Sequence, residues 1–337
     1  MASGFQADHF RAVCRFDSLN RGSRREEALN SLTTTTAKED HSLLTSAATM
    51  EKFKSARVPL EPVRDLYEDL LFHSGRFQRV LNYRLLRAKE CVVQLDPDMK
   101  SAWFGRYQPQ ERVLGDTGVR DAAIHAIQAC IPHAQLLPVG VRRIVIGKIP
   151  CLLDKLKTLD RVPELLLHAR EVKREGDTFY FDLELLGEDG SVLEQWEGLC
   201  LRKVADIPRR RAWPVALLGP YLERRLEEFV PSANVSVALE RGATSGDAIG
   251  QAAGKPLTVR HRADGKPEVE RELAVSAAHA GELTLAVTSA GPVGCDLEVV
   301  TPRDASVWRD LLGPDGFQLA ELIASEGKTK TLPRRAR

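Results

Sequence analysis

The stretch LGDTGVRDAAIHAIQACIP, residues 114–132, has the pattern of a single helix with a defined start and end. Asp116 or Thr117 is suited to cap a helix that begins near Val119, and Pro132 ends it. The helix carries the apolar residues Ala122, Ile124, Ile127 and Ile131. The sequence therefore predicts one capped helix over this stretch.

Two strands are expected further along the chain, in TFYFDLELL, residues 178–186, and SVLEQWEGLCLRKV, residues 191–204. GEDG, residues 187–190, separates them and is a strong hairpin signal. A helix packed against a curved antiparallel sheet is the plan of the hotdog fold. The sequence therefore predicts an α+β fold in which a sheet wraps one helix.

Residues 114–132 resemble the second half of the double-hotdog dehydratase domains of polyketide synthases. The signature of that half is an Asp followed four residues later by Gln or His, which Asp121 and His125 match. LFHSGRFQRV, residues 71–80, resembles the opening strand of the same half. The resemblance implies dehydration of 3-hydroxyacyl thioesters, with Asp121 as the acid and His125 beside it on the same helix face.

The resemblance also implies a base, but the sequence motif that carries this base in the family is missing. In the family it is a His in H-x-x-x-G-x-x-x-x-P of the first hotdog, and this motif does not occur in the chain. Residues 4–16 resemble the last strand of that first hotdog, and neither His9 nor His73 has the required spacing. We therefore expect the chain to begin inside the dehydratase domain and Asp121 alone to give no efficient dehydration.

The second informative stretch is DGKPEVERELAVSAAHAGELTLAVTSAGPVGCDLE, residues 264–298. At its end apolar residues alternate with Asp296 and Glu298, so a strand there would place both carboxylates on one face. Oxygen ligands of this kind suit Mg²⁺, which usually also keeps waters and substrate phosphates as ligands. Lys266 and His279 are candidate phosphate contacts. The pattern predicts a metal-assisted phosphate-ester site.

This second stretch resembles the 4'-phosphopantetheinyl transferases, which move phosphopantetheine from coenzyme A to a serine of an acyl carrier protein with Mg²⁺. The resemblance implies Asp296 and Glu298 as metal ligands, Lys266 as a coenzyme A contact and His279 as a contact to the nucleotide phosphate. Two departures stand out. Ala278 occupies the place of the usual Ser, and no W-x-x-K-E motif follows Glu298. The third metal-site acid is therefore missing, and we expect a truncated domain.

With both resemblances in this order, the chain is most similar to a C-terminal fragment of an iterative polyketide synthase of the enediyne type. The expected organisation has five parts: the end of a first hotdog (1–16), a linker or disordered insert (17–60), the second hotdog (61–205), a linker (206–220) and an α/β phosphopantetheinyl transferase-like domain, incomplete at its C-terminus (221–337). The implied function is holo-acyl-carrier-protein synthesis together with half of a dehydratase.

Composition sets broader limits on the class of protein. The 337 residues carry a formal net charge of +1 with 43% hydrophobic and 28% charged residues, which is ordinary for a soluble globular protein and favours neither nucleic acid nor a membrane as partner. No apolar run is long enough to span a bilayer, and the N-terminus has no signal-peptide pattern. The six cysteines form no C-x-x-C pair, which favours the cytoplasm.

Two alternatives remain open. A hotdog half presents an apolar groove, so the chain is also compatible with a non-catalytic module that binds an acyl group or coenzyme A. A hotdog thioesterase or acyl-CoA hydratase is the other alternative, but it leaves GKP, His279 and GCDLE unexplained. Half of a double hotdog exposes a sheet edge, which favours aggregation or pairing as a homodimer.

Overall fold

The computed structural model describes the residue ranges 57–67, 69–97, 103–105, 107–108, 116–146, 164–207, 212–230, 234–270 and 273–326. These residues fall within one compact unit, Met50–Arg337. The expected remnant of a first hotdog (1–16) and nearly all of the expected linker (17–60) lie outside the described residues, as does the C-terminal GKTKTLPRRAR.

A six-stranded antiparallel sheet forms the centre of the first part, with strand order β1-β2-β4-β5-β6-β3. Its strands are β1 (Val80–Leu86), β2 (Glu90–Leu95), β3 (Ala134–Ile146), β4 (Leu165–Glu175), β5 (Thr178–Leu186) and β6 (Val192–Asp206). The predicted hairpin is confirmed, because β5 and β6 pair on either side of residues 187–190. The order places β1 and β3 at the two edges of the sheet.

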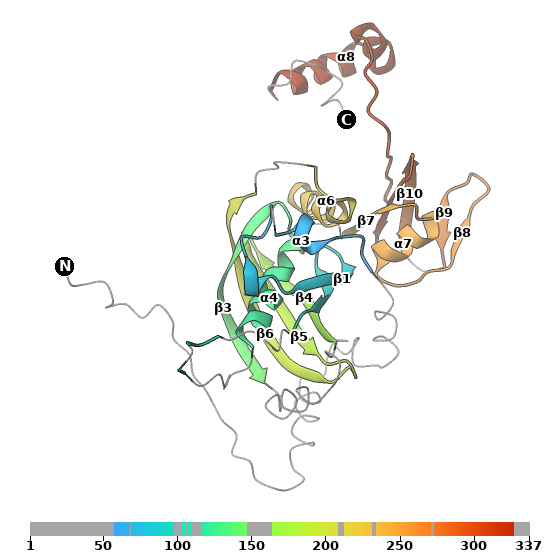
Figure 1. Ribbon diagram of the computed structural model, residues 1–337. Helices are drawn as coiled ribbons and strands as arrows, with labels where there is room; N and C mark the ends of the chain where they lie inside the picture. Colours follow the sequence, from blue (N-terminus) through green and yellow to red (C-terminus); the bar gives the residue numbers. More distant parts are fainter. Residues whose placement is uncertain are drawn as a thin grey trace, which may run out of the picture. The chain divides into compact units, whose positions relative to one another are not determined.

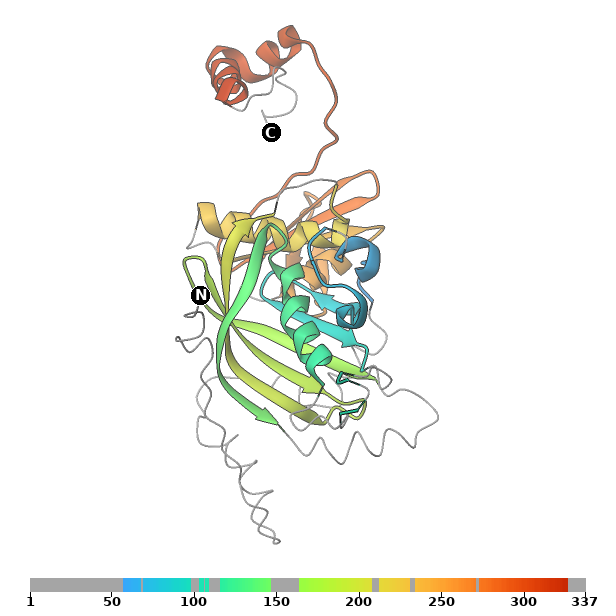
Figure 2. The ribbon, with the colours of Figure 1, turned by 60° about the vertical axis from the view of Figure 1, so that its left-hand side comes forward.

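Helix α4 (Thr117–His125) lies against the curved sheet and continues into the 3₁₀ helix η2 (Ala126–Cys130) (Figure 2). Its predicted cap is confirmed, since the carboxylate of Asp116 accepts hydrogen bonds from the amides of Gly118 and Val119 at 2.8 and 3.2 Å, and the helix begins at Thr117, slightly before the expected Val119. Such a cap satisfies amides that have no partner within the helix. The helix and the antiparallel sheet together confirm the α+β hotdog-like fold.

The core lies between this helical segment and the sheet. Of the four apolar residues that the sequence assigned to this helix, Ala122, Ile127 and Ile131 are fully buried and Ile124 is partly buried. Ala126 is fully buried too, and small residues such as Ala122 and Ala126 let the helix approach the strands closely. Tyr83 from β1 crosses this interface, and its hydroxyl donates a 2.7 Å hydrogen bond to the carbonyl of Ala126.

Helix α6 (Val215–Phe229) corrects the expected boundary between the two parts of the chain (Figure 1). We expected a linker over 206–220, but β6 continues to Asp206 and the helix begins at Val215. The basic, proline-containing stretch ADIPRRRAWP, residues 205–214, had suggested this connection. The structure nevertheless carries Pro220 inside α6.

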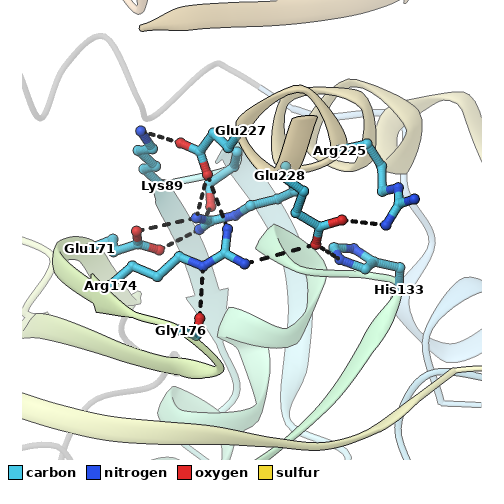
Figure 3. A network of polar contacts seen from close by, with 10 residues as sticks. Lys89, His133, Glu171, Arg174, Gly176, Arg225, Glu227 and Glu228 are labelled. Atoms are coloured by element: carbon cyan, nitrogen blue, oxygen red, sulfur yellow. Dashed lines mark hydrogen bonds and ion pairs between the residues drawn. The ribbon is translucent and has the colours of Figure 1, made fainter. Parts of the chain in front are cut away.

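A network of charged side chains joins α6 to the sheet (Figure 3). The side chain of Arg224 is only 1% exposed, and its guanidinium contacts Glu171 of β4, Glu227 and the carbonyl of Ala88. Arg174 reaches Glu227 from β4 at 3.5 Å. A buried guanidinium needs such partners, because an unpaired charge in the interior is costly. The network therefore fixes α6 against this part of the sheet.

The second part contains a three-stranded antiparallel sheet of order β10-β11-β7 and a separate pair, β8 with β9. Its elements are β7 (Val235–Arg241), α7 (Ser245–Ala253), β8 (Val259–His261), β9 (Pro267–Val269), β10 (Ala274–Ala280), β11 (Leu283–Ser289) and α8 (Ala305–Glu326). A small core that includes Ala248 and Ile249 of α7 and Ala286 of β11 holds helix and sheet together. Helix α8 is interrupted at Gly313, which has a positive φ of 68°.

The remaining elements are short. Helix α3 (Pro62–Asp65) and the 3₁₀ helix η1 (Gly75–Phe77) precede β1 and frame the segment that carries Tyr67 and His73. Among the described residues, no helix is long and apolar enough to cross a membrane.

Candidate functional site

Asp121 and His125 occupy successive turns of α4 and face the same way. Nδ1 of His125 lies 3.3 Å from Oδ2 of Asp121. The imidazole is 5% exposed and the carboxylate 36% exposed. The sequence placed these two residues on one helix face, and the structure brings them into contact as that spacing requires.

His73 completes the cluster from another part of the chain. Its Nε2 lies 3.4 Å from the same Oδ2 of Asp121. Its ring lies 4.0 Å from the ring of His125 and stacks on Phe72 at 4.3 Å between centroids. We did not expect a catalytic role for His73 from the sequence, because its spacing does not match that of the family's base. Only its place in LFHSGRF, beside the expected opening strand, hinted at a role.

Tyr67 is a buried neighbour of the cluster that contacts His125. Its hydroxyl lies 3.0 Å from Nε2 of His125 and accepts a 3.1 Å hydrogen bond from the amide of Val80. Burial raises the pKa of Tyr67 to about 12, so the hydroxyl stays neutral at physiological pH. The phenol therefore fixes the orientation of the His125 ring without adding charge.

The environment of His73 favours its neutral form. Burial lowers the pKa of this imidazole below the usual 6.5, and the neighbouring His125 lowers it further, while Asp121 acts in the opposite direction. A neutral imidazole keeps a nitrogen lone pair at neutral pH and can accept a proton. His73 is thus suited to act as a base next to a carboxyl group.

Two buried polar contacts hold α4 in place below the cluster. At its start, the carboxylate of Asp116 lies 3.5 Å from the guanidinium of Arg79. At its end, the side-chain amide of Gln128 donates hydrogen bonds to the carbonyls of Ile131 and Ala134 and accepts one from the amide of Leu136 at 3.1 Å. Helix and edge strand are therefore joined at a fixed distance, which preserves the position of Asp121.

The cluster is accessible from one side. Asp121 is its most exposed member, and the ring of Phe72 beside His73 is 71% exposed. An exposed aromatic ring next to two proton-transfer groups offers apolar contact to a substrate chain. The arrangement is therefore chemically suited to general acid–base catalysis on a small reacting group.

The four site residues predicted in the second part belong to other elements than the members of this cluster. Lys266 is exposed in the turn between β8 and β9. His279 on β10 is exposed, and its ring nitrogens lie 2.8 Å from the hydroxyl of Ser245 and 2.9 Å from that of Thr284. Asp296 and Glu298 are both exposed.

The local prediction for Asp296 and Glu298 needs a correction. We expected GCDLE in a strand, but residues 292–304 have no regular secondary structure. The alternation itself is present, since Val293, Cys295 and Leu297 are partly buried while both carboxylates are exposed. The amide of Cys295 donates to the hydroxyl of Ser276 at 3.2 Å, so the segment is tethered to β10 without forming a ladder.

Within the described part of the chain, potential metal ligands gather elsewhere than the sequence predicted. One oxygen or nitrogen atom from each of His73, Asp121 and His125 lies within 4.8 Å of the others, whereas Asp296 and Glu298 belong to no such group of three. Cys91, Cys130, Cys200 and Cys295, the four described cysteines, are free thiols.

Comparison with protein families identifies the first part of the chain. Residues 53–211 match the family described as the polyketide synthase dehydratase N-terminal domain. These residues, 159 of the 337 in the chain, are therefore similar to polyketide synthase dehydratase domains. The predicted dehydratase domain and its hotdog-like fold are thereby confirmed. The matching family is named for an N-terminal domain, whereas the resemblance of residues 114–132 pointed to the second half, so the assignment to one half remains a prediction.

The solved structures that match this chain share little sequence identity with it. The dehydratase domain of a mycocerosic acid synthase-like polyketide synthase is 23% identical, with 40% of this chain and 44% of that chain covered and a TM-score of 0.29. The dehydratase domain from the CurF module of curacin polyketide synthase is 18% identical, covering 39% and 42% of the two chains, with a TM-score of 0.28. A hypothetical thioesterase from Streptococcus pneumoniae TIGR4 is 9% identical, covering 37% and 87%, with a TM-score of 0.27.

The chain spans less than half of the length of the dehydratase structures that it matches. No curated protein matches it. The enediyne type and the transferase domain therefore remain predictions from sequence.

Proposed function

We propose that the dehydratase domain removes water from a 3-hydroxyacyl thioester carried by an acyl carrier protein. The observation that supports this most directly is the contact between Nε2 of His73 and Oδ2 of Asp121 at 3.4 Å. It joins a base and an acid from two separate segments of the chain. Dehydration of such a thioester requires both groups within reach of adjacent carbon atoms.

In the proposed reaction, neutral His73 takes the proton from the carbon next to the thioester carbonyl. The electron pair of that C–H bond forms the new double bond, and the hydroxyl leaves with a proton from Asp121 as water. The product is the 2-enoyl thioester. His73 then carries a proton and Asp121 has lost one, and their contact allows the proton to return directly.

The neighbouring residues have supporting roles in this proposal. His125 lies 3.3 Å from the carboxylate of Asp121 and is itself oriented by the hydroxyl of Tyr67. Both act through Asp121 and are positioning residues. Phe72 offers its exposed ring to the acyl chain.

A direct assay tests this function. The full chain is incubated with a 3-hydroxyacyl thioester on a carrier protein, and the loss of one water is followed by mass spectrometry. We expect the Asp121→Asn variant to be slower by about 10²–10⁴-fold, the range typical for one general acid. Arg142→Gln is a matched control, because its side chain is 75% exposed on β3 and contacts Glu197 only at the surface. Equal rates for wild type and Asp121→Asn would refute the proposal.

We infer a second candidate function for residues 234–300, the transfer of 4'-phosphopantetheine from coenzyme A to a carrier-protein serine. Its support is the alternation of burial at 293–298, which leaves Asp296 and Glu298 exposed. Two carboxylates are the oxygen ligands that Mg²⁺ takes, and they would leave its other positions to waters and phosphate. His279, held by Ser245 and Thr284, is suited to contact an anionic phosphate.

In this second proposal Mg²⁺ would supply charge stabilisation at the pyrophosphate of coenzyme A. Lys266 and His279 would bind the nucleotide. The test is calorimetry of coenzyme A binding with and without Mg²⁺, together with phosphopantetheine transfer to a carrier protein. We expect Asp296→Ala to abolish the Mg²⁺ dependence. Binding that is the same with and without the metal would refute this candidate.

A further inference from the structure

We propose that His73, Asp121 and His125 form a binding site for a divalent transition-metal ion, with Zn²⁺ as the best-matched metal. The ion would occupy the same nitrogen and oxygen atoms that the proposed dehydration uses, so bound metal would inhibit that reaction, and the inference itself does not depend on the dehydration. It rests on how three potential ligands converge from two elements. Asp121 and His125 come from α4, and His73 comes from the segment before η1.

The distances between the donor atoms match those of a tetrahedral site. Oδ2 of Asp121 lies 3.4 Å from Nε2 of His73 and 3.3 Å from Nδ1 of His125. Zinc binds imidazole nitrogen and carboxylate oxygen at about 2.0–2.1 Å, so two ligands of a tetrahedron lie about 3.3 Å apart. Two of the three ligand separations therefore already have the required length.

The third separation needs little adjustment. The selected ligand atoms of all three residues lie within 4.8 Å of one another. The rings of His73 and His125 are already packed together, with centroids 4.0 Å apart and planes inclined by 32°. The remaining difference is therefore within the range that a change of a side-chain torsion angle covers.

The chemistry of the donors selects the class of metal. Two imidazoles and one carboxylate are a ligand set of catalytic zinc sites and suit Co²⁺ equally well in geometry. Mg²⁺ and Ca²⁺ prefer sites built from oxygen alone. Three protein ligands leave a fourth position open on the side where Asp121 is exposed.

Tyr67 supplies the outer contact that metal-binding histidines usually have. Its hydroxyl lies 3.0 Å from Nε2 of His125, the ring nitrogen that points away from Asp121. If Nε2 carries the hydrogen and donates it to the phenol, Nδ1 presents its lone pair toward Asp121. Outer partners of this kind fix the tautomer and the ring orientation of a ligand, and their loss typically lowers metal affinity 10–100-fold.

The test is a titration of the full, tag-free, chelator-treated chain with Co²⁺, followed by visible absorption spectroscopy. We expect one ion per chain, with the intense visible bands of a four-coordinate site, and displacement of these bands by an equivalent of Zn²⁺. His73→Ala and Asp121→Asn should lose the bands. His261→Ala, which removes an exposed imidazole of β8, should keep them.

The Tyr67→Phe variant distinguishes the loss of a metal ligand from misfolding as the cause of lost bands. This variant keeps all three ligands and should bind Co²⁺ about tenfold or more weakly while its bands remain visible. Absence of the bands in the wild-type chain would overturn the proposal, as would His73→Ala and Asp121→Asn variants that bind like wild type. Since no substrate is present, the outcome is independent of whether the chain dehydrates thioesters.

Discussion

Oδ2 of Asp121 lies 3.4 Å from Nε2 of His73 and so connects helix α4 to the segment that precedes β1. The contact brings together two groups that the sequence does not place near each other. It supplies a candidate base for a dehydratase domain whose usual base motif is absent from the chain.

The pH dependence of dehydration should report His73. Its pKa is lowered from the usual 6.5, first by burial and then by His125. A base works only in its neutral form, so activity should persist below pH 6.5 and fall as the pH drops through the lowered pKa. The measurement is kcat/KM as a function of pH, which reports groups of the free enzyme. An acidic limb centred at or above pH 6.5 would disagree with the assignment.

The ion pair between Arg224 and Glu171 should be essential for stability. Both side chains are buried, with 1% and 6% exposure. Arg224→Met leaves Glu171 buried without its main partner, so we expect a loss of about 3–5 kcal/mol in the free energy of unfolding. The measurement is urea denaturation. The double variant Arg224→Met/Glu171→Leu should recover part of the loss, and a double variant less stable than the single one would argue against this reading.

The buried carboxyl of Glu223 should make the free energy of unfolding decrease as the pH rises. Burial raises the pKa of this carboxyl above its usual 4.5, while its Oε2 accepts a 2.9 Å hydrogen bond from the amide of Val237. Above pH 4.5 the unfolded chain loses this proton while the folded chain retains it, so folding becomes less favourable up to the raised pKa.

The variant Glu223→Gln tests this effect, because it keeps an acceptor for Val237 and cannot ionise. We expect the two proteins to be equally stable below pH 4.5 and the variant to be more stable at neutral pH. Thermal unfolding over a pH series measures the difference. A difference that does not change with pH would show that Glu223 does not titrate as described.

Gly118 should tolerate no side chain. A Cβ at this position would lie 2.8 Å from Nε of Arg79 and 2.9 Å from Cζ2 of Trp103. Arg79 is buried and its Nε donates to the carbonyl of Arg76, so it cannot move aside freely. Gly118→Ala should therefore cost about 1–3 kcal/mol in chemical denaturation, as overpacking does. Gly140→Ala is the control, since nothing lies within 4 Å of its added Cβ, and a comparable loss there would remove the steric explanation.

Helix α4 and the β5–β6 hairpin could be predicted because their signals are local. The cap at Asp116 and the turn over 187–190 are set by neighbouring residues and need no tertiary information. The pair Asp121 and His125 follows from the helical repeat alone. His73 could not be found in this way, because its contact with Asp121 exists only once the segment before β1 folds over α4.

Two boundaries show the limit of local signals. The basic, proline-containing stretch 205–214 suggested a connection, but buried contacts of Arg224 and Glu223 hold α6 in place from Val215 onward. At Asp296 and Glu298 the predicted alternation of buried and exposed side chains is present, but the predicted strand is not. Extended backbone alone makes side chains alternate, whereas a strand also needs a hydrogen-bonded neighbour.

The measurement that tests the central claim most directly is dehydration by His73→Ala with and without added imidazole. The account predicts a rate about 10²–10⁴-fold below wild type. Free imidazole should restore part of it, because it can enter the space of the missing ring and act as the base. A His73→Ala variant that dehydrates the 3-hydroxyacyl thioester at the wild-type rate would contradict the account.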